Sequence, residues 1–343
     1  MGRAPSLVRS SRPAAQKPPS ERATAVPVSV VINTLDRREH LRRTLVALRE
    51  QTHPEFEVIV VNGPSVDGTD EMLESFRGRA RLATCAEASL GRSRNVGVAE
   101  ASGEIVAFID DDAVPAPGWL QTLAAPYGDP AVAAVGGPVF DIPLGRVAWA
   151  SCTCTRLGVP DTESEGPTER YLGAGADPFL YLPGCNMSFR RRVLDEVGGF
   201  NPLLRHNYDD AEVCSRVVDR GHRIHVVDEV LVRHDRAPNP TRDGQLALRD
   251  PYPGVYCRAV FASHVQQSAD RAEEIADCIR DAADEMHALA DNYLAAGRFT
   301  PSERDAFVQR AQSAMEDGLG AGRDARPTVS FGDARGAAFL PYR

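Results

Sequence analysis

Short runs rich in valine and isoleucine alternate with segments of helical periodicity through the N-terminal two thirds of the chain. The runs occupy residues 26–33, 56–62 and 104–109, and leucines at helical spacing follow the first of them. A run that is apolar on both faces predicts a strand buried on both sides, as in a parallel sheet. Strands and helices alternating at this spacing predict an α/β fold with helices on both faces of the sheet.

The third run ends in three consecutive aspartates, Asp110, Asp111 and Asp112. Burying an ionised carboxylate without a partner is strongly unfavourable. The aspartates are therefore either solvated or they hold a positive ligand. In open α/β sheets, ligands bind beyond the carboxyl ends of the strands. The aspartates fall at that end, which favours a functional site.

The patterns divide the chain into three parts. Residues 1–25 are rich in Pro, Ala, Ser and Arg without apolar periodicity, and they predict a disordered basic tail. Residues 26–254 form the α/β domain, in which the Gly- and Pro-rich stretch 143–178 predicts lid or binding loops. Residues 255–343 are expected to form a C-terminal helical module with a loose end.

Several helix ends carry local signals. Asp36 and Glu39 stand at capping-box spacing before the first helix, and Asp67 or Thr69 is expected to cap the second. Gly198 is expected to close the helix that begins near residue 190.

The first helix of the C-terminal module carries an apolar seam with steps of four and three residues: Ile275, Ile279, Ala282, Met286, Leu289 and Tyr293. So short a helix is marginal alone, so the seam must pack against something. The partners left open are the second helix from Pro301, the α/β domain, or the same helix of another chain in a homodimer. A hairpin with the second helix is favoured because the link is short. We expect its remaining flanks to pack on the α/β domain.

The net charge and the cysteines indicate which classes of partner and which cellular compartment to expect. The net charge of −9 argues against a nucleic-acid partner, because such domains usually run strongly basic. No run of about 18 apolar residues predicts a transmembrane helix. Seven scattered cysteines favour a reducing, cytoplasmic compartment, with Cys152 and Cys154 either free thiols or a metal pair. The tail, with a net charge of +4, is either an inert leader or a weak peripheral contact with the inner face of the membrane.

Motifs on both sides of the aspartates carry a family resemblance. After them come "PGCNMSFRR" (183–191), "GGFNP" (198–202), "YDDAEVCSR" (208–216) and "VRH" (232–234), and before them "VSVVINTLDRREHLRRTLVAL", "EVIVVNGPSVDGT" and "GRSRNVGVAEASGEIVAFIDDD". In this order, over roughly residues 27–235, they resemble a family 2 glycosyltransferase with the GT-A fold. The resemblance implies an inverting, hexosyltransferase-type enzyme. Its donor would be a nucleotide-diphospho-sugar, and its acceptor a hydroxyl of a glycan, glycolipid or natural product.

A metal belongs to the chemistry that the resemblance implies. The departing nucleoside diphosphate gains negative charge, which a divalent ion bridging its phosphates stabilises as a Lewis acid. Carboxylate oxygens are the ligands that hard cations prefer. The resemblance implies Mn²⁺ or Mg²⁺ held by Asp112, with His234 as a further ligand. It places Asp110 and Asp111 beside the donor.

The resemblance implies further donor-binding positions, and one of them departs from the family pattern. These positions are Asn33, Asp36, Asn62, Arg94 and Asn95. The family commonly has Asp at the position of Asn62, and an amide offers different donors and acceptors to a base. The identity of the nucleotide, UDP against GDP or dTDP, therefore stays open.

An acceptor hydroxyl loses a proton as it attacks, so the reaction needs a general base. The resemblance assigns this role to Asp210 in "YDDAEVCSR". The helix N-terminus favours the ionised form of Asp210, whereas the adjacent Asp209 disfavours it, and the sequence leaves the balance open. Glu212 and Arg216 stand at i,i+4 spacing and are expected to form an ion pair.

Two other functions are compatible with some of the same residues. A catalytically silent relative would keep the fold to bind a sugar nucleotide or a partner, but the presence of Asp112, Asp210 and His234 favours an enzyme. "DDDAV" also fits the motif of haloacid-dehalogenase-type phosphatases. That family usually opens on the motif at its first strand, whereas here at least two strand–helix units precede it.

Overall fold

The computed structural model describes residues 25–342, except residues 166, 230, 266–270, 325–328 and 332–337. The predicted disordered tail, apart from Ala25, lies outside the described residues. None of the described helices is long and apolar enough to cross a membrane.

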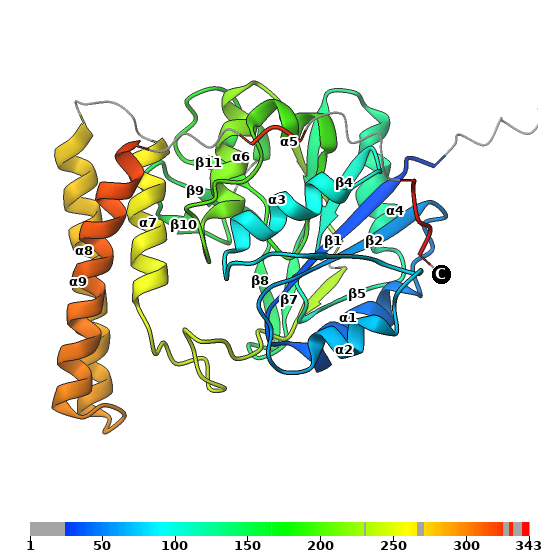
Figure 1. The fold of residues 1–343 in the computed structure, drawn as a ribbon. Helices are drawn as coiled ribbons and strands as arrows, with labels where there is room; N and C mark the ends of the chain where they lie inside the picture. Colours follow the sequence, from blue (N-terminus) through cyan, green and yellow to red (C-terminus); the bar gives the residue numbers. More distant parts are fainter. Residues whose placement is uncertain are drawn as a thin grey trace, which may run out of the picture.

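A seven-stranded mixed sheet forms the centre of the molecule (Figure 1). Its strands, in spatial order, are β13 (Arg223–Val226), β6 (Val132–Gly136), β12 (Met187–Arg190), β4 (Ile105–Phe108), β1 (Val28–Thr34), β2 (Phe56–Asn62) and β3 (Arg81–Thr84). β1 runs parallel to β2 and β4, whereas β12 runs antiparallel to β4 and β6. The α/β prediction is confirmed, and the strand runs at 26–33, 56–62 and 104–109 match β1, β2 and β4.

Successive residues of β1 point to opposite faces of the sheet, and each face is covered by helices. Val30 and Ile32 pack with α1 (Arg38–Leu48), α2 (Thr69–Glu74) and α4 (Trp119–Ala124). Val31 faces the cluster formed by α3 (Leu90–Glu100), α5 (Arg191–Val197) and α6 (Asp209–Asp219). The strands are therefore buried on both sides, as their unbroken apolar runs predict.

Two smaller sheets take three short strands, β8 (Arg146–Trp149), β9 (Cys152–Cys154) and β10 (Pro160–Asp161), from the stretch predicted to be loops. One contains β5 (Ala113–Pro115), β14 (Val232–His234), β7 (Val139–Asp141) and β8. The other contains β10, β9 and β11 (Phe179–Tyr181). Two short 3₁₀ helices, η1 (Ala125–Gly128) and η2 (Thr168–Tyr171), lie between strands. The loop prediction for 143–178 is thus wrong in part. These strands are too short to show an alternating pattern, and they form by pairing with distant segments.

The structure contradicts one of the predicted helix ends and confirms another. α1 begins at Arg38, and the Asp36 carboxylate accepts a hydrogen bond from the Val66 backbone N–H at 2.6 Å instead of capping that helix. The capping-box prediction is therefore wrong, because Asp36 adopts a left-handed conformation with φ of 54° that turns it toward the next loop. Asp67 accepts a hydrogen bond from the Thr69 backbone N–H at 3.1 Å before α2. Gly198, with φ of 83°, ends α5 as predicted.

The C-terminal helices are α7 (Tyr252–Val265), α8 (Ala272–Ala295) and α9 (Pro301–Asp324). α7 has no counterpart in the sequence prediction, and it begins three residues before the boundary expected at residue 255. Its Cys257, Val260 and Phe261 belong to the main core. It shows no amphipathic pattern because it lies between that core and α9 and is covered on both sides.

The first half of the α8 seam is buried within the chain, and the second half is partly buried. Ile275 and Ile279 pack with Leu319 of α9, Ala259 of α7 and Leu157 of the α/β domain. The predicted hairpin and the predicted packing of the module on the α/β domain are both confirmed. A homodimer stays a prediction, and it would have to use a different surface from these buried seam residues.

Candidate active site

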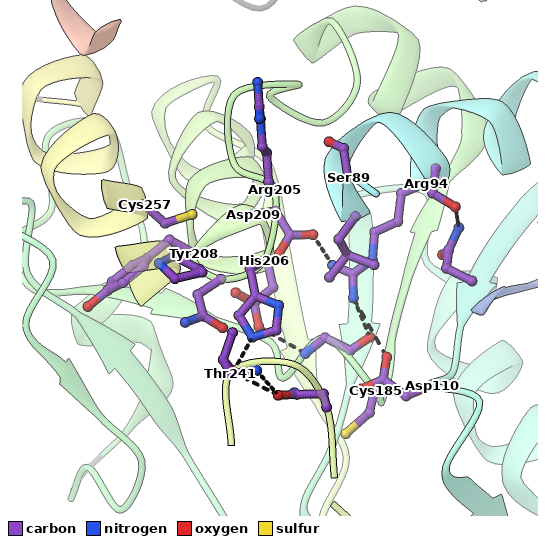
Figure 2. A pocket seen from close by; sticks show the side chains of 18 of the residues that line it. Ser89, Arg94, Asp110, Cys185, Arg205, His206, Tyr208, Asp209, Thr241 and Cys257 are labelled. Carbon is purple, nitrogen blue, oxygen red and sulfur yellow. Dashed lines mark hydrogen bonds and ion pairs between the residues drawn. The ribbon is translucent and has the colours of Figure 1, made fainter. Parts of the chain in front are cut away.

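A cavity of about 900 Å³ opens at the carboxyl edge of the central strands. Asn33 enters it from β1, the three aspartates from the end of β4, and His234 from the end of β14. Asp209 and Asp210 enter from the start of α6, and Figure 2 shows the wall that carries Arg94, Asp110 and Asp209. The cavity therefore lies at the edge of the sheet that the sequence predicted, and five aspartates line it.

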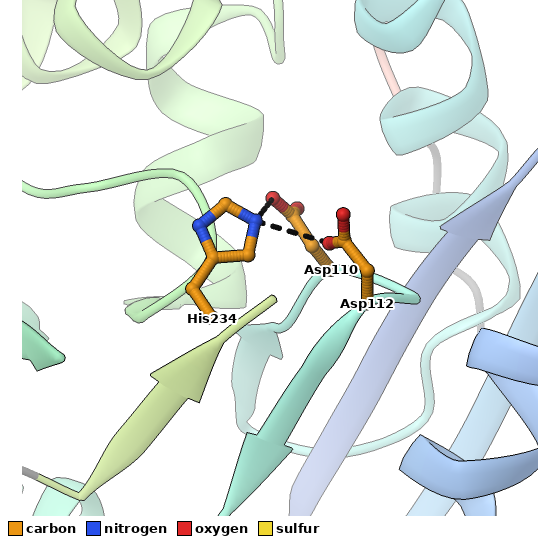
Figure 3. Close-up of side chains that lie close together, drawn as sticks. All are labelled: Asp110, Asp112 and His234. Atoms are coloured by element: carbon orange, nitrogen blue, oxygen red, sulfur yellow. Dashed lines mark hydrogen bonds and ion pairs between the residues drawn. The ribbon is translucent and has the colours of Figure 1, made fainter. Parts of the chain in front are cut away.

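Asp110, Asp112 and His234 converge on one point of this cavity (Figure 3). His234 Nε2 lies 3.0 Å from Asp112 Oδ1 and 3.7 Å from Asp110 Oδ2. Adjacent ligands of an octahedral ion with bonds of 2.0–2.1 Å lie about 3 Å apart, so these separations fit a small divalent ion. Two carboxylates and an imidazole suit Mn²⁺ or Mg²⁺ in donor type. Asp110, which the resemblance places beside the donor, thus lies within reach of the two expected ligands.

The charges around this group shift its pKa values. Burial would raise the pKa of Asp112, but the hydrogen bond and charge of His234, with Arg37, hold it well below the usual range. Burial would lower the pKa of His234, and its contacts with Cys185 and Asp112 raise it well above the usual value instead. Burial raises the pKa of Asp111 to about 7, against the opposing effect of Arg37. Asp112 is thus the carboxylate most firmly kept ionised.

Asp209 and Asp210 begin α6 but have different surroundings. Asp209 is buried and forms an ion pair with the buried guanidinium of Arg94. Arg94 also donates to the Gly184 carbonyl at 3.2 Å and lies 5.4 Å from the ring centre of Phe200. Burial raises the pKa of Asp209 to about 7, although Arg94 opposes the rise. This pair fixes the start of the helix in the cavity wall.

Asp210 lines the cavity with both carboxylate oxygens held by backbone. Oδ2 accepts from the Gly184 N–H at 3.0 Å and Oδ1 from the Ala211 N–H at 2.8 Å. Each oxygen keeps a further lone pair. Burial raises the pKa of Asp210, which outweighs the opposing effects of Arg94 and the backbone N–H groups. The balance that the sequence left open is therefore set by burial.

Comparisons with known proteins decide the family. The family described as Glycosyl transferase family 2 matches residues 29–198. The glucosyl-dolichyl phosphate glucuronosyltransferase of Haloferax volcanii is 27% identical over 263 residues, covering 73% of this chain and 82% of that protein. A pre-mycofactocin glycosyltransferase of Mycobacterium tuberculosis is 27% identical over 210 residues, 61% of this chain and 42% of that protein. The chain belongs to glycosyltransferase family 2.

Solved structures identify the fold of this glycosyltransferase as GT-A. A mannosyltransferase from Pyrobaculum calidifontis, in complex with GDP-Man and Mn²⁺, aligns with a TM-score of 0.52 and 19% identity over 87% of this chain and 88% of that one. S. aureus TarS 1–349 in complex with UDP-GlcNAc aligns with a TM-score of 0.50 and 17% identity, over 87% and 90% of the two chains. The phosphatase alternative is excluded by the family and the fold together.

Three expected donor-binding residues of the glycosyltransferase do not line the cavity. Asn95 is buried, and its amide exchanges two hydrogen bonds of 2.8 Å with the Phe200 backbone. Asn62 is buried as well and donates to Asp70 Oδ1 at 2.7 Å while accepting from Ser65. Asp36 is exposed and holds the 63–66 loop. These placements give all three residues structural contacts, whereas Asn33 and Arg94 do reach the cavity.

The glycosyltransferase cavity also contains residues that sequence reasoning did not identify. Arg37 contacts Asp112, and Cys185 Sγ lies 3.9 Å from His234 Nδ1. Further lining residues come from the loop before α6, the segment after β14, and α7: Arg205, His206, Asn207, Asn239, Thr241, Arg242, Tyr252 and Tyr256. No local motif distinguished Arg37 from the adjacent Arg38, and α7 gave no signal in the sequence either.

The expected ion pair of α6 is present and braces the acidic end of the helix. Arg216 Nε donates to Glu212 Oε1 at 2.8 Å, and Arg216 also donates to the Gly199 carbonyl at 2.7 Å. His264 of α7 lies 3.1 Å from the same carboxylate. The helix that carries Asp209 and Asp210 is thereby tied to both α5 and α7.

Proposed function

We propose that this glycosyltransferase transfers a hexosyl group from a nucleotide-diphospho-sugar to an acceptor hydroxyl, with inversion and with a divalent metal. The observation that carries the proposal is that Asp110, Asp112 and His234 converge in the cavity that also exposes Asp210. The GDP-Man, UDP-GlcNAc and Mn²⁺ in the neighbours' structures support a donor and an ion of these classes.

The residues of the cavity divide the reaction between them. Asp110, Asp112 and His234 would hold Mn²⁺ or Mg²⁺, which when bound supplies Lewis-acid stabilisation of the donor's phosphates. Asp210 accepts the proton of the acceptor hydroxyl at a free lone pair of its carboxylate. The acceptor oxygen bonds to the anomeric carbon as the bond to the nucleoside diphosphate breaks, and the leaving group keeps the electron pair. One displacement of this kind inverts the anomeric configuration.

Metal dependence is the first test. A panel of nucleotide sugars with Mn²⁺, scored by thermal shift and slow donor hydrolysis, should identify a donor. Asp112→Asn should abolish metal-dependent nucleotide binding and turnover, because it removes one charge and one ligand oxygen of the metal group. Asp235→Asn is a matched control, since Asp235 is a half-buried carboxylate next to His234 that pairs with Arg43 at 3.1 Å. Full activity of the wild type in excess EDTA would contradict the proposal.

We also propose a cytoplasmic enzyme with at most weak peripheral membrane contact. All seven cysteines are free thiols, which supports a reducing compartment. Cys152 and Cys154 are buried in β9, and burial raises the pKa of both thiols, which fits inert packing residues.

A further inference from the structure

Arg37 is the residue immediately before α1. Its side chain extends to Asp112, which forms the metal group together with Asp110 and His234. Its Nη1 lies 2.6 Å from Asp112 Oδ2 and 3.5 Å from Asp111 Oδ1. Its Nη2 donates to the Ala237 carbonyl at 3.2 Å. The Arg37 side chain is only 13% exposed, so these contacts are shielded from water. One guanidinium therefore joins the aspartates that follow β4 to the segment that follows β14.

The two oxygens of Asp112 have separate partners. Oδ1 lies 3.0 Å from His234 Nε2, on the side of the metal group. Oδ2 accepts from Arg37 and, at 2.8 Å, from the Ala237 backbone N–H. The carboxylate is thus fixed with one oxygen turned toward Asp110 and His234, and the other is occupied. Outer contacts of this kind set the orientation and the affinity of metal ligands.

The same contacts hold the chain segment 237–242. Asn239, Thr241 and Arg242 of this segment line the cavity. Just before it, Arg236 adopts a φ of 48°, an uncommon conformation for a non-glycine residue that requires support from its surroundings. Both the N–H and the carbonyl of Ala237 are bound, to Asp112 and to Arg37 respectively. The segment is therefore fastened at the residue that follows this turn.

We infer that Arg37 is a positioning residue of the transfer reaction. It orients Asp112 so that one carboxylate oxygen faces Asp110 and His234, and it fastens segment 237–242 to the cavity. The inference rests on the metal site of the proposed function.

Charge and orientation predict opposite signs for the loss of Arg37. By charge alone, removing a guanidinium beside the site would tighten the binding of a cation. If Arg37 instead orients Asp112, removing it leaves the Asp112 carboxylate and the Ala237 carbonyl without this partner, and the binding of the cation weakens. A measurement of metal affinity on the otherwise intact protein therefore separates the two.

The experiment titrates Mn²⁺ into the full chain by calorimetry, with and without UDP or GDP, and follows hydrogen exchange of residues 237–242. Arg37→Met should weaken Mn²⁺ binding about 10–100-fold, the usual cost of losing an outer contact to a metal ligand. Arg37→Lys keeps the charge but not the forked geometry, so its loss should be smaller. Exchange of 237–242 should quicken in both variants. Arg43→Met, at an exposed arginine of the same helix that pairs with Asp235, should match the wild type.

Three outcomes would overturn the inference. Mn²⁺ binding by Arg37→Met equal to or tighter than that of the wild type would make Arg37 a bystander or a competitor of the metal. If Arg37→Met does not fold, Arg37→Lys serves as the test variant. A Mn²⁺ affinity and a rate of hydrogen exchange in residues 237–242 that both equal those of the wild type would then refute the positioning role. If the wild type itself fails to bind Mn²⁺ with or without nucleotide, the proposed metal site is wrong, and the role of Arg37 falls with it.

Discussion

At the scale of residues, the two neighbouring carboxylates at the start of α6 differ in their contacts, which suits them to different roles. Asp209 is paired with the buried Arg94, so its charge is committed to holding the wall of the cavity. Asp210 lines the cavity, and within the described part of the chain its carboxylate is hydrogen-bonded by backbone N–H groups, which leaves lone pairs free. A general base needs this combination of a fixed position and an uncommitted oxygen.

Asp210→Asn should therefore lose transfer by about 10²–10⁴-fold, the usual contribution of a positioned base. Mn²⁺ and nucleotide binding should persist, because the metal group lies on other residues. Because burial raises the pKa of Asp210 and the base acts deprotonated, the wild-type rate should fall as pH falls through that raised pKa. The fall should thus begin at a higher pH than for an ordinary aspartate. The pH profile of kcat/KM measures it.

Asp277→Asn, at an exposed position of α8, is the control for that substitution. Retention of the donor's anomeric configuration in the product, or a near-normal rate of Asp210→Asn, would refute the assignment.

The position of a residue in the cavity was predictable from the sequence where a local motif fixes it. The aspartates, Asp210 and His234 follow strands or begin a helix whose ends the sequence marks, and all reach the cavity. Asn95 could not be placed in this way, because its amide is bound by the backbone of Phe200, 105 residues away. Arg37 is another such case, since its partner Ala237 lies 200 residues along the chain. Such contacts depend on tertiary structure that no local pattern encodes.

At the scale of elements, α7 and α9 approach closely at two glycines. A Cβ at Gly318 would lie 2.7 Å from the Tyr256 carbonyl oxygen, and one at Gly322 would lie 2.6 Å from Ser263 Cβ. Gly320, between them, has open space in the described structure. Tyr256 also lines the cavity, so this helix contact positions part of the site. The sequence analysis missed this contact, because its partner helix α7 was not predicted.

Gly318→Ala and Gly320→Ala should therefore change stability in opposite directions. At Gly318 the added methyl meets backbone that cannot move aside, and overpacking of this kind costs about 1–3 kcal/mol. At Gly320 the same change improves helix propensity by roughly 1 kcal/mol without a clash. Urea unfolding of both variants measures the difference. Equal effects at the two sites would show that the α7–α9 contact does not depend on close approach.

At the scale of the whole molecule, the chain returns from the helical module to the opposite side of the α/β domain, where its last residues lie beside β2 (Figure 1). Pro341 forms a bridge with Glu57, and Leu340 N–H donates to the Glu57 carboxylate at 3.1 Å. Tyr342 is buried against Phe56, with ring centres 5.9 Å apart, and its hydroxyl donates to the Leu45 carbonyl at 2.8 Å. The α/β domain is thus completed by residues that follow the helical module in sequence.

The C-terminal residues should accordingly support stability without taking part in the chemistry. Tyr342 packs between α1 and β2 and is not among the residues that line the cavity. Tyr342→Ala should lower the free energy of unfolding by about 3–5 kcal/mol, as for other buried aromatic side chains. Tyr342→Phe should cost only about 1 kcal/mol, for the lost hydrogen bond. Below the melting temperature of each variant, donor hydrolysis should equal that of the wild type. A variant that stays folded but loses donor hydrolysis would contradict this prediction. It would show that the contacts of Tyr342 beside β2 affect the active site.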